Sequence, residues 1–148
     1  MLKGIPAIIP PELLKVLAEM GHGDELCIGD GNFPGETMGK RVVRMDGHGV
    51  PEILDAVLKL IPLDTFVDQP VSLMQVVSGY DGNVPIWDQY RAIVSRHDPR
   101  GAGAIEFVER FAYYERAKLC YCVVMTGEKA VYANVIVKKG VVVGKDAV

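Results

Sequence analysis

Hydrophobic residues recur along the chain with two different periods. Apolar side chains at helical spacing predict four helices, over Glu12–Met20, Val50–Leu60, Ile86–Arg96 and Glu109–Lys118. Pro11 and Pro51 stand near the first turn of two of these helices, where a missing backbone N–H does no harm. Short apolar runs between the helices predict six strands, over Glu25–Ile28, Arg41–Met45, Val71–Val77, Ala104–Val108, Leu119–Met125 and Val131–Val137.

This alternation of strands and helices predicts an α/β fold. We expect a three-layer α/β/α domain in which helices cover both faces of a mostly parallel, mixed six-stranded sheet. The turn Thr126–Lys129 is too short for a helical crossover, so the last two strands should be antiparallel if they pair. The glycine-containing stretch Gly29–Lys40 is predicted to be a loop. No repeat or linker suggests a second domain, so we expect one domain over residues 1–148.

Composition and charge exclude several classes of protein. A chain of 148 residues that is 49% hydrophobic can bury one core, and its net charge of −3 argues against a sequence-independent grip on nucleic acid. The N-terminus lacks the pattern of a secretory signal and every apolar run is too short for a membrane span, so we expect a cytoplasmic protein. Cys27, Cys120 and Cys122 are expected to be reduced core thiols, and no metal site is expected.

His22 is the first candidate for chemistry. Gly21 and Gly23 flank it between the first helix and the first strand, which leaves the imidazole free to project at the rim of a cleft. An imidazole can donate or accept a proton near neutrality, as general acid–base catalysis requires. An ordinary loop histidine beside a helix-ending glycine is the alternative.

Asp30 and Asn32 follow the first strand, at the end of the sheet where α/β proteins commonly bind ligands. A carboxylate there can accept hydrogen bonds from sugar hydroxyls, and an amide can both donate and accept them. Both residue types also form turns without any ligand, so the two interpretations stand side by side.

Two further groups of polar residues occur later in the chain. Arg110 begins a charged helix that also carries aromatic residues, and ion pairing on a solvated face would explain most of that pattern. Tyr132 and Asn134 flank Ala133 in the last predicted strand, where alternation places both polar side chains on one face. They need hydrogen-bond partners, which either a sugar or a neighbouring loop could supply.

Several motifs in fixed order resemble one family across nearly the whole chain. They are Leu2–Pro6, Pro11–Leu14, Glu19–Glu25, Asp30 with Asn32–Pro34, Glu109–Phe111, Tyr114–Ala117, Thr126–Glu128 and Tyr132–Asn134. Together they look like the L-fucose mutarotase and D-ribose pyranase family, and most of them like its fucose branch.

The resemblance implies an isomerase that needs no cofactor and interconverts the α and β anomers of L-fucose. It implies that His22 is the proton donor or acceptor and that Ala133 contributes through its backbone. The side chains implied to contact the sugar are those of Asp30, Arg110, Tyr132 and Asn134. It also implies a ring-shaped homo-oligomer, commonly a decamer, with each site near a subunit boundary. We further hypothesise that Tyr132 exchanges the second proton of the reaction.

One position departs from the fucose branch and keeps alternatives open. Ala133 stands where that branch often has glycine, and Tyr132-Ala133-Asn134 resembles the ribose branch there. The alternatives are therefore a D-ribose pyranase-type activity, with ribose or galactose as the sugar, or a non-catalytic monosaccharide-binding or transport accessory protein. An aldose–ketose isomerase is a third alternative.

Overall fold

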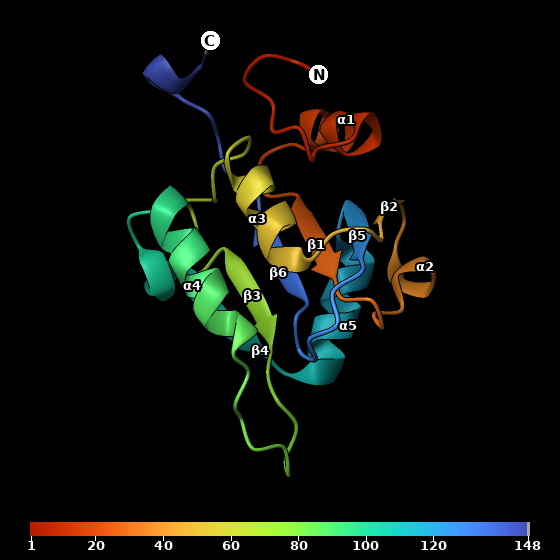
Figure 1. Ribbon diagram of the computed structural model, residues 1–148. Helices are drawn as coiled ribbons and strands as arrows, with labels where there is room; N and C mark the ends of the chain where they lie inside the picture. Colours follow the sequence, from red (N-terminus) through yellow and green to blue (C-terminus); the bar gives the residue numbers. More distant parts are fainter. Residues whose placement is uncertain (148) are drawn as a thin grey trace.

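The computed structural model describes residues 1–147, and within them six strands form one sheet (Figure 1). The strands are β1 (Glu25–Gly29), β2 (Val42–Met45), β3 (Val71–Met74), β4 (Ile105–Val108), β5 (Cys122–Thr126) and β6 (Val135–Lys138). The α-helices are α1 (Pro11–Glu19), α2 (Gly35–Met38), α3 (Val50–Leu58), α4 (Ile86–His97) and α5 (Arg110–Leu119). Short 3-10 helices span Gly101–Ala104 and Gly144–Asp146. Every strand and four of the α-helices overlap a predicted segment.

Several elements differ from the prediction, and strand β5, for example, begins at Cys122, three residues after the predicted start, because α5 extends to Leu119. Helix α2 lies in the stretch predicted to be a loop, because a single helical turn is too short to show a periodic apolar face. Strand β3 ends at Met74, three residues before the predicted end. Strand β6 begins at Val135, because Tyr132 has a φ of 54°, which lies outside the range of a strand.

The strand order is β2-β5-β1-β6-β3-β4, and β6 runs antiparallel to both of its neighbours, β1 and β3. The other pairs are parallel. Strands β5 and β6 therefore run in opposite directions, but β1 lies between them and they do not pair. The connection from β5 to β6, residues 127–134, consequently passes over the C-terminal end of β1. This crossing brings the polar residues that follow β1, Asp30 and Asn32, close to those that precede β6, Tyr132 and Asn134.

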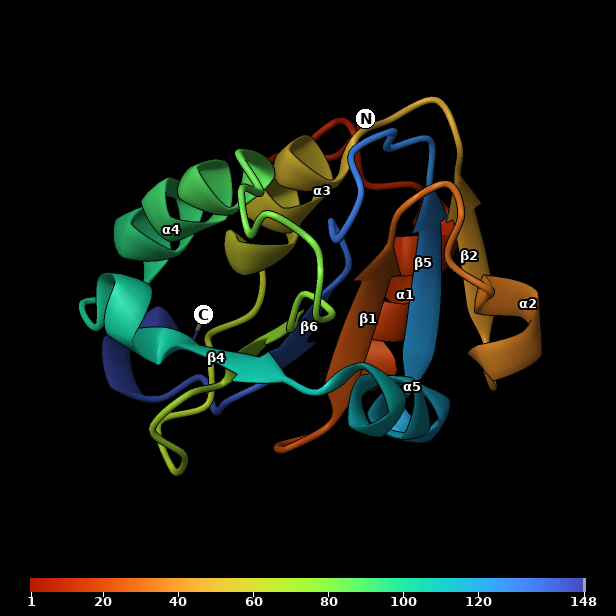
Figure 2. The same ribbon diagram turned by 90° about the horizontal axis from the view of Figure 1, so that it is seen from below.

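Helices cover both faces of the sheet, as the three-layer prediction requires (Figure 2). Helices α1, α3 and α4 share one hydrophobic core with Leu26 and Ile28 of β1. On the opposite face, Cys27 packs with Tyr113 and Ala117 of α5. Apolar side chains point both ways because both faces are covered. Among residues 1–147 no helix is long and apolar enough to cross a membrane.

Candidate functional site

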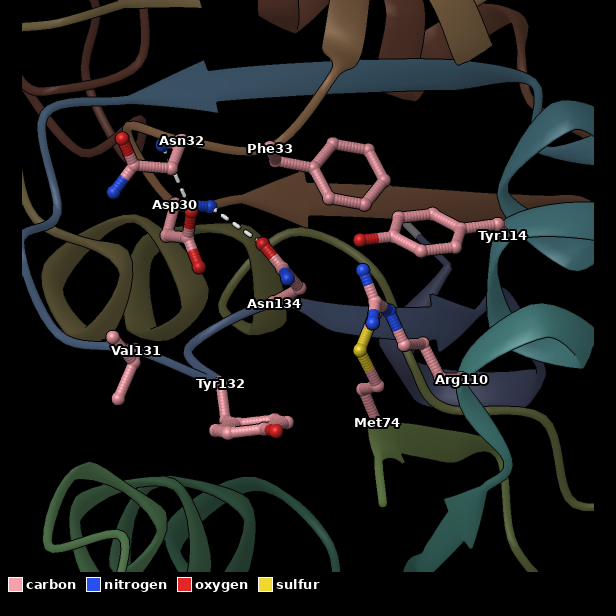
Figure 3. Close-up of a pocket in the computed structure, with 9 residues that line it drawn as sticks. All are labelled: Asp30, Asn32, Phe33, Met74, Arg110, Tyr114, Val131, Tyr132 and Asn134. Carbon is pink, nitrogen blue, oxygen red and sulfur yellow. Dashed lines mark hydrogen bonds between the residues drawn. The ribbon is translucent and has the colours of Figure 1, made fainter. Parts of the chain in front are cut away.

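A cavity of about 270 Å³ opens at the edge of the sheet where β1 and β3 end and β6 begins (Figure 3). This is close to the lower bound of roughly 300 Å³ for small-molecule sites. Its lining residues are Asp30, Asn32, Phe33, Met74, Arg110, Tyr114, Val131, Tyr132 and Asn134. The lining thus combines one carboxylate and one guanidinium with amide, phenol and apolar groups, a mixture that suits a small polar ligand with apolar faces.

Asp30 occupies the position directly after β1 and is only 6% exposed. Its Oδ1 accepts a hydrogen bond from the N–H of Asn32 (2.9 Å), and its own N–H donates to Oδ1 of Asn134 (2.7 Å). Burial raises the pKa of the Asp30 carboxyl, and hydrogen bonds from the backbone N–H groups of Asn32, Ala133 and Phe33 offset part of this rise. The turn and the cavity therefore use the same residue, so the two interpretations of Asp30 are compatible.

Tyr132 has a left-handed backbone conformation, which costs a residue other than glycine on the order of 1–3 kcal/mol. Its hydroxyl accepts a hydrogen bond from the N–H of Val77 (3.3 Å), and its ring packs against Tyr80 with centroids 5.0 Å apart. Tyr132 and Asn134 were expected to point to the same side, and both do line the cavity. The reason differs from the expected one: both residues precede β6, so the left-handed turn at Tyr132 places them there and strand alternation does not.

Arg110 reaches the cavity from the first turn of α5. The Glu109 carboxylate caps this helix by accepting hydrogen bonds from the N–H groups of Phe111 (3.0 Å) and Ala112 (3.1 Å). Four residues along the helix, the Tyr114 ring stacks on Phe33 with centroids 5.9 Å apart. Figure 3 shows the Arg110 guanidinium pointing into the cavity beside the Tyr114 hydroxyl. The cavity thus has an aromatic wall next to its positive charge.

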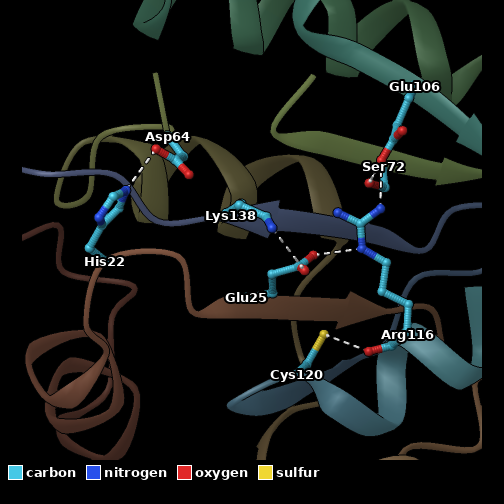
Figure 4. Close-up of polar contacts among 8 residues, drawn as sticks. All are labelled: His22, Glu25, Asp64, Ser72, Glu106, Arg116, Cys120 and Lys138. Carbon is cyan, nitrogen blue, oxygen red and sulfur yellow. Dashed lines mark hydrogen bonds and ion pairs between the residues drawn. The ribbon is translucent and has the colours of Figure 1, made fainter. Parts of the chain in front are cut away.

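His22 lies at the opposite end of β1, in the loop before the strand. Its Nε2 is 3.0 Å from Oδ1 of Asp64, and its ring packs against Phe66 with centroids 4.9 Å apart (Figure 4). Burial raises the pKa of Asp64, but hydrogen bonds from the Phe66 N–H and from His22 outweigh it, so the carboxyl pKa stays below its usual value. The five residues of β1 separate His22 from Asp30 by roughly 16 Å.

The structure brings together four of the six residues predicted to form the site. Asp30, Arg110, Tyr132 and Asn134 line the cavity. Ala133 is fully buried between two of them and presents its backbone. His22 does not line the cavity of its own chain, so a shared cavity with Tyr132 is not formed within one copy of the described chain.

Sequence reasoning missed two polar residues. Tyr114 follows Arg110 at i+4, and this helical spacing would have placed both side chains on one face. Asp64 is 42 residues from His22 and belongs to no motif, so only the fold reveals their contact. Within the described part of the chain, no group of three or more His, Cys, Asp or Glu side chains is arranged to hold a metal ion.

Comparison with known proteins gives consistent matches over the chain. The model of the RbsD / FucU transport protein family matches residues 3–142. A fucose mutarotase from Danio rerio is 49% identical over 148 residues, covering 96% of this chain and 95% of the relative. The crystal structure of FucU from Bifidobacterium longum has a TM-score of 0.93 and 62% identity, covering 95% of this chain and all of that one. The fucose mutarotase from Streptococcus pneumoniae in complex with L-fucose has a TM-score of 0.90 and 46% identity, covering 96% and 100%.

Proposed function

This chain belongs to the RbsD/FucU family, and from that premise we propose that it is an isomerase that interconverts the α and β anomers of free L-fucose. One observation carries the proposal: a buried carboxylate, Asp30, faces the guanidinium of Arg110 and the phenol of Tyr132 across a cavity of about 270 Å³. A structure of a relative with 46% identity in complex with L-fucose supports the choice of sugar.

The reaction requires two coupled proton transfers. One group removes the proton from the anomeric hydroxyl while another protonates the ring oxygen, so that the C1–O5 bond breaks and the open aldehyde forms. Rotation about the C1–C2 bond and the reverse transfers then close the ring with the opposite configuration. No electrons are exchanged, and each catalytic group recovers its proton state over the cycle. Positioned acid–base groups typically contribute about 10²–10⁴-fold to such steps.

The cavity lining suggests how the sugar is held. The Asp30 carboxylate accepts hydrogen bonds from sugar hydroxyls, and the Arg110 guanidinium donates to sugar oxygens. Asn134 is held by the Asp30 N–H at its Oδ1, which leaves its NH₂ group as a donor. Phe33 and Met74 supply apolar surface for the C–H faces and the methyl group of a 6-deoxy sugar. These contacts limit rotation of the sugar and so favour a reactive geometry.

Tyr132 is the proposed proton-transfer group inside the cavity. The Val77 N–H donates to its hydroxyl oxygen, so the phenolic proton itself remains available to a sugar oxygen. His22 is the proposed second group, and it must come from a neighbouring copy because it lies at the far end of β1. Its side chain is 43% exposed beside the 78% exposed Phe66, which makes this end accessible to a neighbouring copy.

The proposal therefore includes a ring-shaped homo-oligomer, a decamer, in which each cavity receives His22 from the next copy. Head-to-tail contacts of this kind close into rings. Residence in the cytoplasm is proposed as well, since Cys27, Cys120 and Cys122 are unpaired and buried. A non-catalytic sugar-binding protein would need the cavity but would have no use for His22 and Asp64.

Saturation-transfer NMR of anomeric protons tests the activity directly. With L-fucose, D-ribose and D-galactose compared at equal protein concentration, we expect the fastest added exchange between anomers for L-fucose. A protein that broadens or shifts the sugar signals without accelerating exchange would be a binder, and the enzymatic proposal would be rejected. Appearance of a ketose would point instead to an aldose–ketose isomerase.

Mixed particles test where His22 acts. Chains carrying His22→Ala are co-expressed with chains carrying Asp30→Asn, and each variant alone is expected to be inactive. If a site takes His22 from one copy and Asp30 from another, about a quarter of the sites in an equal random mixture are intact. Native mass spectrometry verifies that the particles are mixed. Mixed particles without recovered activity would place His22 outside the neighbouring cavity.

A further inference from the structure

Two aromatic side chains of α4 hold the backbone that carries Tyr132. Nε1 of Trp87 donates a hydrogen bond to the carbonyl oxygen of Tyr132 (2.9 Å), and the hydroxyl of Tyr90 donates to the carbonyl oxygen of Ala133 (2.6 Å). Both side chains are buried in the core on the α4 face of the sheet. Neither lines the cavity, so they do not touch the sugar in the proposed complex.

These two bonds fix the orientation of consecutive peptide groups. Because the carbonyl of Tyr132 is held toward α4, the N–H on the other side of the same peptide, that of Ala133, points toward the Asp30 carboxyl and lowers its pKa. The next residue, Asn134, then accepts the hydrogen bond from the Asp30 N–H (2.7 Å). Contacts with α4 on one side and with Asp30 on the other thus hold the backbone around the left-handed Tyr132.

We propose that Trp87 and Tyr90 are positioning residues that hold Tyr132 and the Ala133 N–H in the geometry that the anomer exchange requires. This inference rests on the proposed function, because it assigns the two residues a role in that same cavity. Without the two donors, the peptide between Tyr132 and Ala133 can rotate and the strained φ of Tyr132 can relax. The phenol would then move away from the sugar, although every residue that contacts the sugar would still be present.

The molecule supplies a comparison within its own core. Tyr113 is as fully buried as Tyr90, at 0% exposure, yet within residues 1–147 its hydroxyl has no nitrogen or oxygen partner and lies among apolar groups and the Cys27 thiol. The fold therefore tolerates a buried phenol that donates to no oxygen or nitrogen. The Tyr90 hydroxyl instead meets a carbonyl at the entry to β6, next to the strained residue. Removing the hydroxyl of Tyr90 and that of Tyr113 in separate variants distinguishes a general effect of losing a core hydroxyl from a specific effect on the cavity.

The experiment compares three variants, Trp87→Phe, Tyr90→Phe and Tyr113→Phe, with kcat and KM measured by anomer-exchange NMR. For Trp87→Phe and Tyr90→Phe we expect kcat to fall about 10- to 100-fold, a loss typical of misplaced catalytic groups, with a smaller change in KM. Tyr113→Phe should stay within about twofold of the unchanged protein. Rates are normalised to the folded fraction from circular dichroism, and if Trp87→Phe does not fold, Tyr90→Phe alone decides.

A folded Tyr90→Phe protein with unchanged kcat would overturn the inference. Crystal structures of Tyr90→Phe and Tyr113→Phe give an independent check, because φ at residue 132 should leave the left-handed region only in the first. If the unchanged protein accelerates no anomer exchange, the proposed function fails, and the affinities of the same variants for L-fucose then decide. Affinity about tenfold weaker for Tyr90→Phe alone would support the positioning role, and equal affinities would overturn it.

Discussion

The two ends of β1 differ in the burial of their polar residues and in the groups that hold them. After the strand, Asp30 is buried and held by backbone N–H groups, and residues from three other segments close a cavity around it. Before the strand, His22 stands 43% exposed on a loop, and one buried carboxylate, that of Asp64, holds its ring. In the proposed function, one end binds the sugar and supplies Tyr132 while the other supplies His22, but in a single chain the two ends lie about 16 Å apart. Under the proposed function, this difference means that the concave, preorganised end of one copy and the exposed end of another together form one site.

Removal of the imidazole is expected to have the largest effect. His22→Ala should lower the catalysed rate of anomer exchange by about 10²–10⁴-fold, the range typical of a lost acid–base group. Affinity for L-fucose, measured by titration calorimetry, should change little because the cavity is intact. His48 is a matched control, since its side chain is 42% exposed and also contacts a carboxylate, that of Glu52 (3.1 Å). If His48→Ala lost as much activity as His22→Ala, the two ends of β1 would not differ as described.

At the cavity end the expected effect is on binding. Arg110→Ala should weaken affinity for L-fucose about 10- to 100-fold, because hydrogen bonds from a charged donor contribute about 1.5–3 kcal/mol. Arg91, whose side chain is 41% exposed and forms an ion pair only with Asp88 in the described residues, provides the control. Arg91→Ala should bind L-fucose as the unchanged protein does. Retained affinity in Arg110→Ala would remove this guanidinium from the sugar contacts.

A smaller loss is expected when the support of His22 is weakened. Asp64→Asn keeps an acceptor for the Phe66 N–H but removes the charge beside the imidazole. We expect kcat to fall about tenfold, as for the loss of partners that orient a functional histidine, with affinity for L-fucose unchanged. Unchanged kcat in a correctly folded protein would show that His22 needs no carboxylate.

The smallest effect on activity is expected for an acidic residue at neither end. Lys59, His97 and Arg96 surround the Asp55 carboxylate and hold its pKa well below the usual value. A depressed folded-state pKa contributes stability above the unfolded pKa of about 3.9, and this contribution is lost as the pH falls toward the folded value. Asp55→Asn should therefore lower the free energy of unfolding at pH 7 by about 1–3 kcal/mol, and the difference should shrink below about pH 4.

Urea titrations at pH 7 and pH 3 measure this difference, and the rate of anomer exchange at 25 °C should stay unchanged. Reduced activity in Asp55→Asn would mean that loss of stability alone impairs the site. The losses expected at the two ends of β1 would then need to be corrected for stability.

The sequence predicted the individual strands and helices better than the contacts between segments that are far apart in the chain. Apolar runs located all six strands, most clearly the central strands, which are covered on both faces, and the residues directly after β1 line the cavity at the edge where a ligand site was expected. The placement of β1 between β5 and β6 depends on long-range pairing, which leaves no local pattern. The left-handed backbone at Tyr132 also depends on distant partners, Trp87 and Asp30, so the last strand was predicted to begin too early.

Strand β6 connects the two halves of the proposed chemistry more directly than any other element. Its first residue follows Asn134, and the residue after its end, Lys139, donates hydrogen bonds through Nζ to the carbonyl oxygens of Leu17 and Met20, just before the His22 loop. A slip of one residue in its register would turn all of its side chains to the other face and misplace both ends. Both ends therefore depend on the correct pairing of the four residues of β6. A chain in which this strand is mispaired is expected to lose sugar recognition and proton transfer together.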